Sequence, residues 1–193
     1  MRPREKMQSS ELENPISTGG DFLSSPVDET AGQLQWHVLQ TKPRQEKILA
    51  QDLAARKLEF FLPLQLKVNY HGSRKMTLEL PLFPGYLFLR GSLDDVYTVD
   101  RGKRVAKIIR VSQQDHLDRE LKNIRLALEG KATLDPYPYL KTGSRAEVKF
   151  GPMRGLQGIV EQRLGMTRLV LQIDMLGQAV SLEIDGSLLD PLD

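Results

Sequence analysis

Apolar residues fill both faces of the stretch 80–90, L-P-L-F-P-G-Y-L-F-L-R, and the rest of the chain can be ordered around it. Successive side chains of an extended strand point to opposite faces. This alternation predicts two sets of side chains, one of Phe83, Leu87 and Leu89 and the other of Leu82, Tyr86 and Phe88. One face must line a core, and the other requires a covering layer or a partner. A buried central strand is the ordinary interpretation of such a run, and a binding strand is the alternative.

The apolar pattern before this stretch predicts a strand, a helix and a hairpin. The strand at 35–40 contains the single Trp of the chain. A helix follows it, because apolar residues recur at helical spacing from Ile48 to Leu58. Residues 59–90 then contain two extended apolar runs around a Gly-containing turn, which is typical of a β-hairpin.

The pattern after this stretch predicts a short helix, a strand and a long helix. Ser92 and Asp95 have the spacing of a capping box at the start of the short helix. A strand at 105–111 leads to an amphipathic helix that Ser112 caps and Gly130 ends. The whole order indicates an α+β domain with a largely antiparallel sheet and two longer helices on one face.

Composition divides the chain into four segments. Residues 1–33 are rich in Ser, Glu, Pro and Gly without a sustained period, and we expect a disordered tail. The α+β domain spans 34–131, and a Pro-Tyr-Pro-Tyr sequence marks a linker at 132–141. Residues 142–193 alternate short apolar runs with Gly-containing turns, which predicts a small all-β barrel of about five strands.

Charge is distributed unevenly along the chain. Lys and Arg number 3 against 6 Asp and Glu in residues 1–33, 18 against 11 in residues 34–133, and 6 against 8 in residues 134–193. The excess positive charge of the middle segment favours contact with a phosphate backbone, although charged helix faces are more often simply solvated. Five cations lie in two turns of this segment, and they converge if both turns open at one edge: Lys42, Arg44, Arg101, Lys103 and Arg104. A solvated loop edge is the alternative interpretation.

The remaining composition argues against several classes of protein. The chain has no Cys, so it has neither disulfides nor a thiolate metal site, and a reducing cytoplasm is the expected location. No apolar run reaches the length of a membrane span. His37, His71 and His116 lack the spacing of metal ligands, so we expect no metal site. No nucleophile, acid–base pair or phosphate loop stands out, and we expect neither a cofactor nor enzymatic activity.

Three motifs of residues 34–131 resemble the N-terminal (NGN) domain of NusG-family transcription factors. They are Trp36-His37-Val38-Leu39 with its following helix, the run 81–88, and Arg104-Val105 before a strand. Residues 148–160, V-K-F-G-P-M-R-G-L-Q-G-I-V, look like the KOW motif of the same family's C-terminal SH3-like β-barrel. The resemblance covers about residues 34–192. It implies an antiparallel NGN sheet with flanking helices, followed by a KOW barrel.

The resemblance also implies partners for particular residues. Tyr86, Phe88 and Leu82 would bind the clamp helices of RNA polymerase, and Tyr97 and Thr98 would meet the opposite jaw of the enzyme. The two basic turns, Lys42 and Arg104 in particular, match positions that approach the exposed non-template DNA strand in specialised paralogues, so all five cations are candidate nucleic-acid contacts. In the C-terminal barrel, Met153, Met175 and Leu176 would contact a small-subunit ribosomal protein, or the barrel would bind termination factor Rho.

The run Pro-Leu-Phe-Pro and the short hairpin turn resemble the specialised RfaH-like and UpxY-like paralogues of the family. The resemblance therefore implies a monomeric transcription elongation or antitermination factor that acts on specific long operons. A KOW-containing translation accessory protein that binds the ribosome or RNA is the alternative. Because Gly and Pro interrupt every candidate helix of residues 142–193, we expect a permanent β-structure that leaves Tyr86 and Phe88 available.

Overall fold

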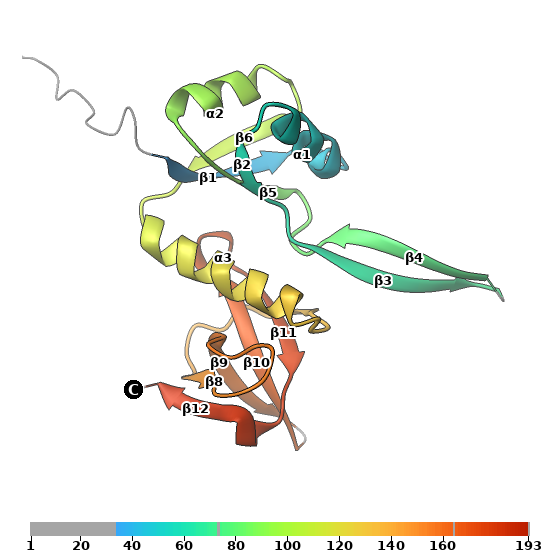
Figure 1. The fold of residues 1–193 in the computed structure, drawn as a ribbon, viewed down its shortest axis with the longest axis vertical. Coiled ribbons are helices and arrows are strands. Elements are labelled where there is room, and N and C mark those ends of the chain that lie inside the picture. Colours follow the sequence, from blue (N-terminus) through green and yellow to red (C-terminus); the bar gives the residue numbers. More distant parts are fainter. Residues whose placement is uncertain (1–33, 73, 164, 193) are drawn as a thin grey trace, which may run out of the picture. The chain divides into compact units, whose positions relative to one another are not determined.

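The computed structural model describes residues 34–72, 74–163 and 165–192. The tail predicted at 1–33 lies outside the described residues. The described part contains antiparallel sheets and three α-helices, as the sequence predicted for an α+β protein (Figure 1). None of the described helices is long and apolar enough to cross a membrane.

Four strands form the N-terminal sheet. In sequence order they are β1 (Gln35–Thr41), β2 (Glu59–Phe61), β5 (Tyr86–Gly91) and β6 (Val105–Arg110). Their order in the sheet is β2-β5-β1-β6, and every neighbouring pair is antiparallel. The run at 80–90 thus supplies β5, which is a central strand because it pairs with β2 on one side and β1 on the other. Both faces of β5 are apolar, and both are buried.

Three helices cover this sheet from two sides. Helix α1 (Glu46–Ala55) and helix α2 (Leu93–Asp100) pack on the face that carries Leu39, Leu87 and Leu89. Helix α3 (Gln114–Glu129) packs on the face that carries Trp36, Val38 and Phe88. The expectation that the two longer helices share one face is therefore wrong. Since both faces of the central strands are apolar, each face requires its own cover.

The turn before β5 alters the predicted arrangement of its side chains. Gly85 has φ 84°, and the Tyr86 N–H donates to the Phe83 carbonyl at 3.1 Å, so residues 82–85 turn instead of continuing the strand. The Phe83 ring consequently packs edge to face against Phe88, with ring centroids 6.4 Å apart, and does not join Leu87 and Leu89. The predicted alternation of side chains between the two faces fails at residues 82–85 because the turn interrupts the extended backbone.

The hairpin expected between residues 59 and 90 is present as a separate two-stranded sheet. Strands β3 (Leu64–His71) and β4 (Arg74–Pro81) pair in antiparallel register (Figure 1). Leu66, Tyr70 and Met76 on this hairpin are exposed, at 68%, 70% and 46%. The hairpin therefore buries little apolar surface along its own length.

Six strands form the C-terminal sheet. They are β7 (Asp135–Tyr137), β8 (Ser144–Val148), β9 (Gln157–Arg163), β10 (Met166–Ile173), β11 (Gln178–Glu183) and β12 (Leu189–Leu192). Two short 3₁₀ turns, η1 (Asp174–Leu176) and η2 (Gly186–Leu188), follow β10 and β11. The order is β12-β8-β9-β10-β11-β7, with antiparallel neighbours. The edge strands β12 and β7 do not pair with each other in the described residues, so a closed barrel is not shown.

Strand β7 lies within the stretch predicted as a linker. Its residues pair with Ala179, Val180 and Ser181 of β11. Pro136 is tolerated within β7 because β7 is an edge strand, where one side makes no ladder hydrogen bonds, and Pro138 follows the end of the strand.

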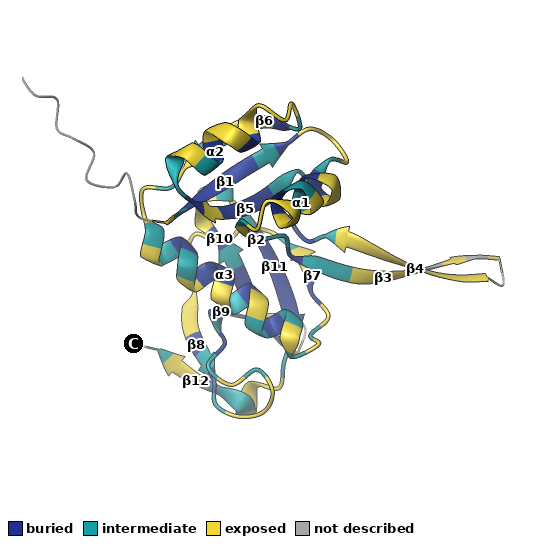
Figure 2. Ribbon diagram, turned by 45° about the horizontal axis from the view of Figure 1, so that its top comes forward, coloured by how far each residue is buried: buried dark blue, intermediate teal, exposed yellow. Residues whose placement is uncertain are grey.

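Helix α3 is covered on its second side by the C-terminal sheet. Leu117, Leu121 and Ile124 of α3 belong to one buried cluster with Leu171 and Ile173 of β10. Figure 2 shows buried positions along the length of α3. The helix is thus shared between the N-terminal sheet and β10.

Candidate functional site

The side chains predicted to bind polymerase differ sharply in exposure. Phe88 is 0% exposed and Leu82 is 5% exposed, and both lie in the cluster that includes α3. Tyr86 is half-buried against the same cluster. Tyr97 and Thr98 are exposed on α2, Tyr97 at 55%. The expectation that Phe88 is available at the surface is therefore wrong for this structure, because α3 belongs to the cluster that buries it.

The two turns that carry the predicted cations lie side by side. The Lys42 N–H donates to the Arg104 carbonyl at 2.9 Å, which joins the loop after β1 to the turn before β6. Lys103 has φ 57° and Arg44 has φ 62°, so both turns use left-handed backbone conformations. Four of the five cations are exposed: Lys42, Arg44, Arg101 and Lys103.

Arg104 differs from its neighbours because its guanidinium is already engaged. Its Nε donates to Asp52 Oδ2 at 2.7 Å, and its Nη1 donates to Gln45 Oε1 at 3.0 Å. Asp52 and Gln45 belong to α1 and its N-terminal cap. Arg104 therefore ties the turn before β6 to α1, and the exposed positive charge comes from the other four residues.

The three residues predicted to bind a ribosomal protein are also unequal. Met175 is 36% exposed in η1. Met153 and Leu176 are half-buried and pack against the cluster that contains α3. Met153 lies so close to Gly130 that a Cβ at that glycine would be 2.5 Å from the Met153 Cγ. Met175 is thus the most accessible of the three.

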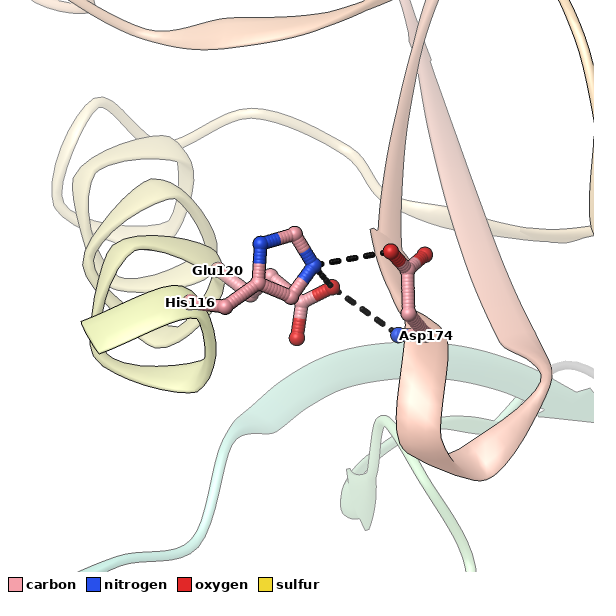
Figure 3. Close-up of side chains that lie close together, drawn as sticks. All are labelled: His116, Glu120 and Asp174. Atoms are coloured by element: carbon pink, nitrogen blue, oxygen red, sulfur yellow. Dashed lines mark hydrogen bonds and ion pairs between the residues drawn. The ribbon is translucent and has the colours of Figure 1, made fainter. Parts of the chain in front are cut away.

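A polar cluster that the sequence analysis missed joins α3 to the turn after β10. The His116 Nε2 lies 2.8 Å from Asp174 Oδ2 and 3.1 Å from Glu120 Oε1 (Figure 3). The Asp174 backbone N–H donates to Glu120 Oε1 at 2.9 Å. The Tyr139 hydroxyl donates to Asp174 Oδ1 at 3.1 Å. His116 and Glu120 of α3 thus meet Asp174 at one point, and Tyr139 joins them from a third segment.

Burial dominates the electrostatics of this cluster. It raises the pKa of Glu120 to about 7, and the negative charge of Asp174 adds to the rise. The hydrogen bond from the Asp174 N–H and the nearby His116 oppose it. The pKa of Tyr139 is also raised, by burial and by its hydrogen bond to Asp174.

One signal for this cluster was present in the sequence. His116 and Glu120 are four residues apart, so they share a face of α3. Asp174 lies 54 residues beyond Glu120, and no local pattern brings it to the helix. The sequence predicted no metal site because the three His residues lack ligand spacing and no Glu or Asp accompanies them in a zinc pattern, and the His116–Glu120 pair alone is not such a pattern.

A second polar group missed by the sequence analysis is His37. His37 is 4% exposed, and neither ring nitrogen has a hydrogen bond of good geometry among the described residues. Burial lowers the pKa of His37, a poorly aligned hydrogen bond with the Gly91 backbone raises it, and the Arg110 charge lowers it further. The side chain lines a cavity of about 170 Å³ together with Tyr97 and Arg110.

One family of known proteins matches the segment that contains most of these features. The family model described as "Transcription termination factor nusG" matches residues 34–125, from β1 into α3. No curated protein matches the chain.

Proposed function

Because the chain belongs to the NusG family through residues 34–125, we propose that it is a non-catalytic transcription elongation or antitermination factor that binds RNA polymerase. The family match carries this proposal, since it covers the N-terminal sheet and both turns that hold the cations. We further propose that it increases processivity on long operons, as specialised paralogues of the family do, and that it acts as a monomer in the cytoplasm.

The exposed residues of this segment provide the first contacts in our proposal. Tyr97 and Thr98 on α2 meet one jaw of the polymerase, and Tyr86 contributes from the edge of the α3-covered face. Phe88 and Leu82 support Tyr86 from within the core. Aromatic side chains that fill a partner's pocket typically dominate such interfaces.

The exposed cations contact the non-template DNA strand in our proposal. Lys42 and Lys103 lie in the two adjacent turns and have no ion-pair partner among the described residues. Cations that replace counterions on a nucleic acid make affinity fall with rising salt.

The C-terminal sheet has a separate role in our proposal. Its six antiparallel strands and the KOW-like residues 148–160 support an SH3-like domain that contacts a small-subunit ribosomal protein or termination factor Rho. Met175 is its most exposed predicted contact, and Leu176 lies beside it.

The test is direct binding of the purified full chain to bacterial core polymerase in an elongation complex with an exposed non-template strand. We expect specific binding, and we expect Tyr97→Ala to weaken it. The double variant Lys42→Ala with Lys103→Ala should weaken binding at low salt and reduce the dependence of log affinity on log salt by about 1.4, at roughly 0.7 for each phosphate contact on a single strand.

The matched control is Arg154→Ala with Arg163→Ala, which removes two exposed cations outside the matched segment. This control should leave the salt dependence unchanged. Absence of binding to polymerase, with co-sedimentation on ribosomal particles in the absence of transcription, would instead support the translation accessory protein.

A further inference from the structure

The cluster of His116, Glu120 and Asp174 offers three metal-ligating atoms at one point. One atom from each residue lies within 4.8 Å of the other two. The imidazole and one carboxylate come from adjacent turns of α3, and the other carboxylate begins η1. Figure 3 shows the His116 ring and the Asp174 carboxylate directed toward each other, with the Glu120 carboxylate beside them.

The spacing of these atoms is close to that of ligands around a small tetrahedral ion. For metal–ligand bonds of about 2.05 Å, neighbouring ligand atoms of a tetrahedral zinc site lie roughly 3.3 Å apart. The His116 Nε2 lies 2.8 Å from one carboxylate oxygen and 3.1 Å from the other. A small outward movement of the side chains is enough to admit an ion, provided that Nε2 carries no proton.

The charge of the Glu120 and Asp174 carboxylates and the burial of Glu120 favour the binding of a cation. Glu120 is only 9% exposed, and its Oε2 is buried without a hydrogen-bond partner among the described residues. Lys141 and Arg145 line the adjoining cavity, but neither forms an ion pair with Glu120 or Asp174. His116 can compensate the two neighbouring carboxylates only when it is protonated, and a bound metal ion compensates them when the imidazole is neutral.

Further groups orient the ligands and leave one position open. The Tyr139 hydroxyl and, more weakly at 3.4 Å, the Gln172 Nε2 donate to Asp174 Oδ1, which leaves Oδ2 directed at His116. Hydrogen bonds of this kind hold metal ligands in position. The cluster also borders a cavity of about 240 Å³ with space for a water molecule as fourth ligand.

We propose that His116, Glu120 and Asp174 bind one Zn²⁺ ion, with a water molecule completing a tetrahedral site. A single imidazole with two carboxylates suits zinc better than Mg²⁺ or Ca²⁺, which prefer all-oxygen sites. Because its ligands come from α3 and from the turn after β10, the ion ties the C-terminal sheet to the helix that covers the N-terminal sheet.

The test uses the full chain without a histidine tag, titrated with Co²⁺ as the spectroscopic probe and then with Zn²⁺. We expect one Co²⁺ per chain with the strong visible absorption of a four-coordinate site, and its complete displacement by Zn²⁺. Zn²⁺ should also raise the melting temperature, because it binds the folded state only.

Isosteric variants locate the site. Glu120→Gln and Asp174→Asn keep the size of each side chain, and each should reduce Zn²⁺ affinity at least about tenfold. Asp115→Asn is the matched control, since this exposed carboxylate lies on α3 outside the cluster, and its affinity should equal that of the wild type. Absence of the visible absorption, or equal affinity in all three variants, would overturn the proposal.

Discussion

The two faces of the N-terminal sheet are built from different lengths of chain. The face that α1 and α2 cover, here the α1/α2 face, has a buried core drawn from residues 39–105. The face that α3 covers, here the α3 face, has a core that extends from Trp36 to Leu182 and includes strands of the C-terminal sheet. The α1/α2 face is therefore completed locally, whereas the α3 face depends on residues far along the chain.

The polar contacts of the two faces follow the same division. On the α3 face, the Gln114 side chain forms hydrogen bonds with both backbone groups of Trp36, at 2.6 and 2.9 Å. The Trp36 Nε1 donates to Asp118 Oδ1 at 3.0 Å, and the Gln157 N–H donates to Asn123 Oδ1 at 3.1 Å. These bonds connect α3 to both sheets. Helix α3 thus contacts both the C-terminal sheet and the cluster against which Tyr86 packs, whereas the residues described in α1 and α2 do not belong to that cluster.

The largest expected effect compares one leucine on each face. Leu53 of α1 is 0% exposed and Leu121 of α3 is 2% exposed. Replacement of either by Ala leaves a cavity and should lower the free energy of unfolding by about 2–5 kcal/mol. Only Leu121→Ala should also increase local amide hydrogen exchange in β10, because Leu121 and β10 share a cluster.

Urea unfolding measures the first effect, and native-state hydrogen exchange measures the second. Equal exchange in β10 for both variants, after correction for global stability, would show that the C-terminal sheet does not depend on the α3 face. Leu53→Ala is the matched control, since it removes the same atoms from the other face.

Most features that depend on neighbouring residues were predicted correctly, whereas two features that depend on distant residues, the packing side of α3 and the polar cluster at His116, were not. The central strand, the hairpin of β3 and β4 and the capping box of α2 follow from local apolar periods and turn chemistry. The side on which α3 packs depends on contacts with residues 134–182, so an apolar stripe alone cannot assign it. The meeting of His116 with Asp174 has the same origin, because only the packing of β10 on α3 brings them together.

A smaller effect is expected at the buried imidazole of the α1/α2 face. Neither ring nitrogen of His37 has a hydrogen bond of good geometry within the part of the chain that the structure describes, so His37→Leu should raise the free energy of unfolding by about 1 kcal/mol at neutral pH. Its folded-state pKa is lowered below the model-peptide value of 6.5, so the unfolded state takes up a proton first as the pH falls. The stability of the wild type should therefore decrease below pH 6.5 relative to the variant.

Urea midpoints of both proteins between neutral and mildly acidic pH measure this difference. The comparison isolates His37 because all other titrating groups are common to the two proteins. A difference that stays constant with pH would show that His37 does not titrate differently in the folded and unfolded states.

The smallest expected effect is found by comparing Ser92 with Ser112. The sequence predicted that Ser92 caps α2, on the α1/α2 face, and that Ser112 caps α3, on the α3 face. Ser92 caps α2: its hydroxyl accepts from the Asp95 N–H at 3.2 Å, and the Asp95 carboxylate accepts from the Ser92 N–H at 2.9 Å. Ser112 was predicted to cap α3, but the helix begins after Gln113 without a side-chain cap, so that prediction is wrong. Gln114 fixes this end of α3 instead, because its amide bonds the Trp36 backbone and its Nε2 donates to the Val111 carbonyl at 3.1 Å.

Ser92→Ala should therefore lower the free energy of unfolding by about 1 kcal/mol, the usual cost of a lost N-terminal cap. Ser112→Ala should change it by less than about 0.5 kcal/mol, as is usual for an exposed side chain without a structural role. Thermal unfolding of the two variants in parallel measures both values under the same conditions. Equal losses of unfolding free energy in the two variants would mean that Ser112 caps α3 in solution. The start of α3 would then be set by a local capping residue, as in α2, and not by the contact of Gln114 with β1.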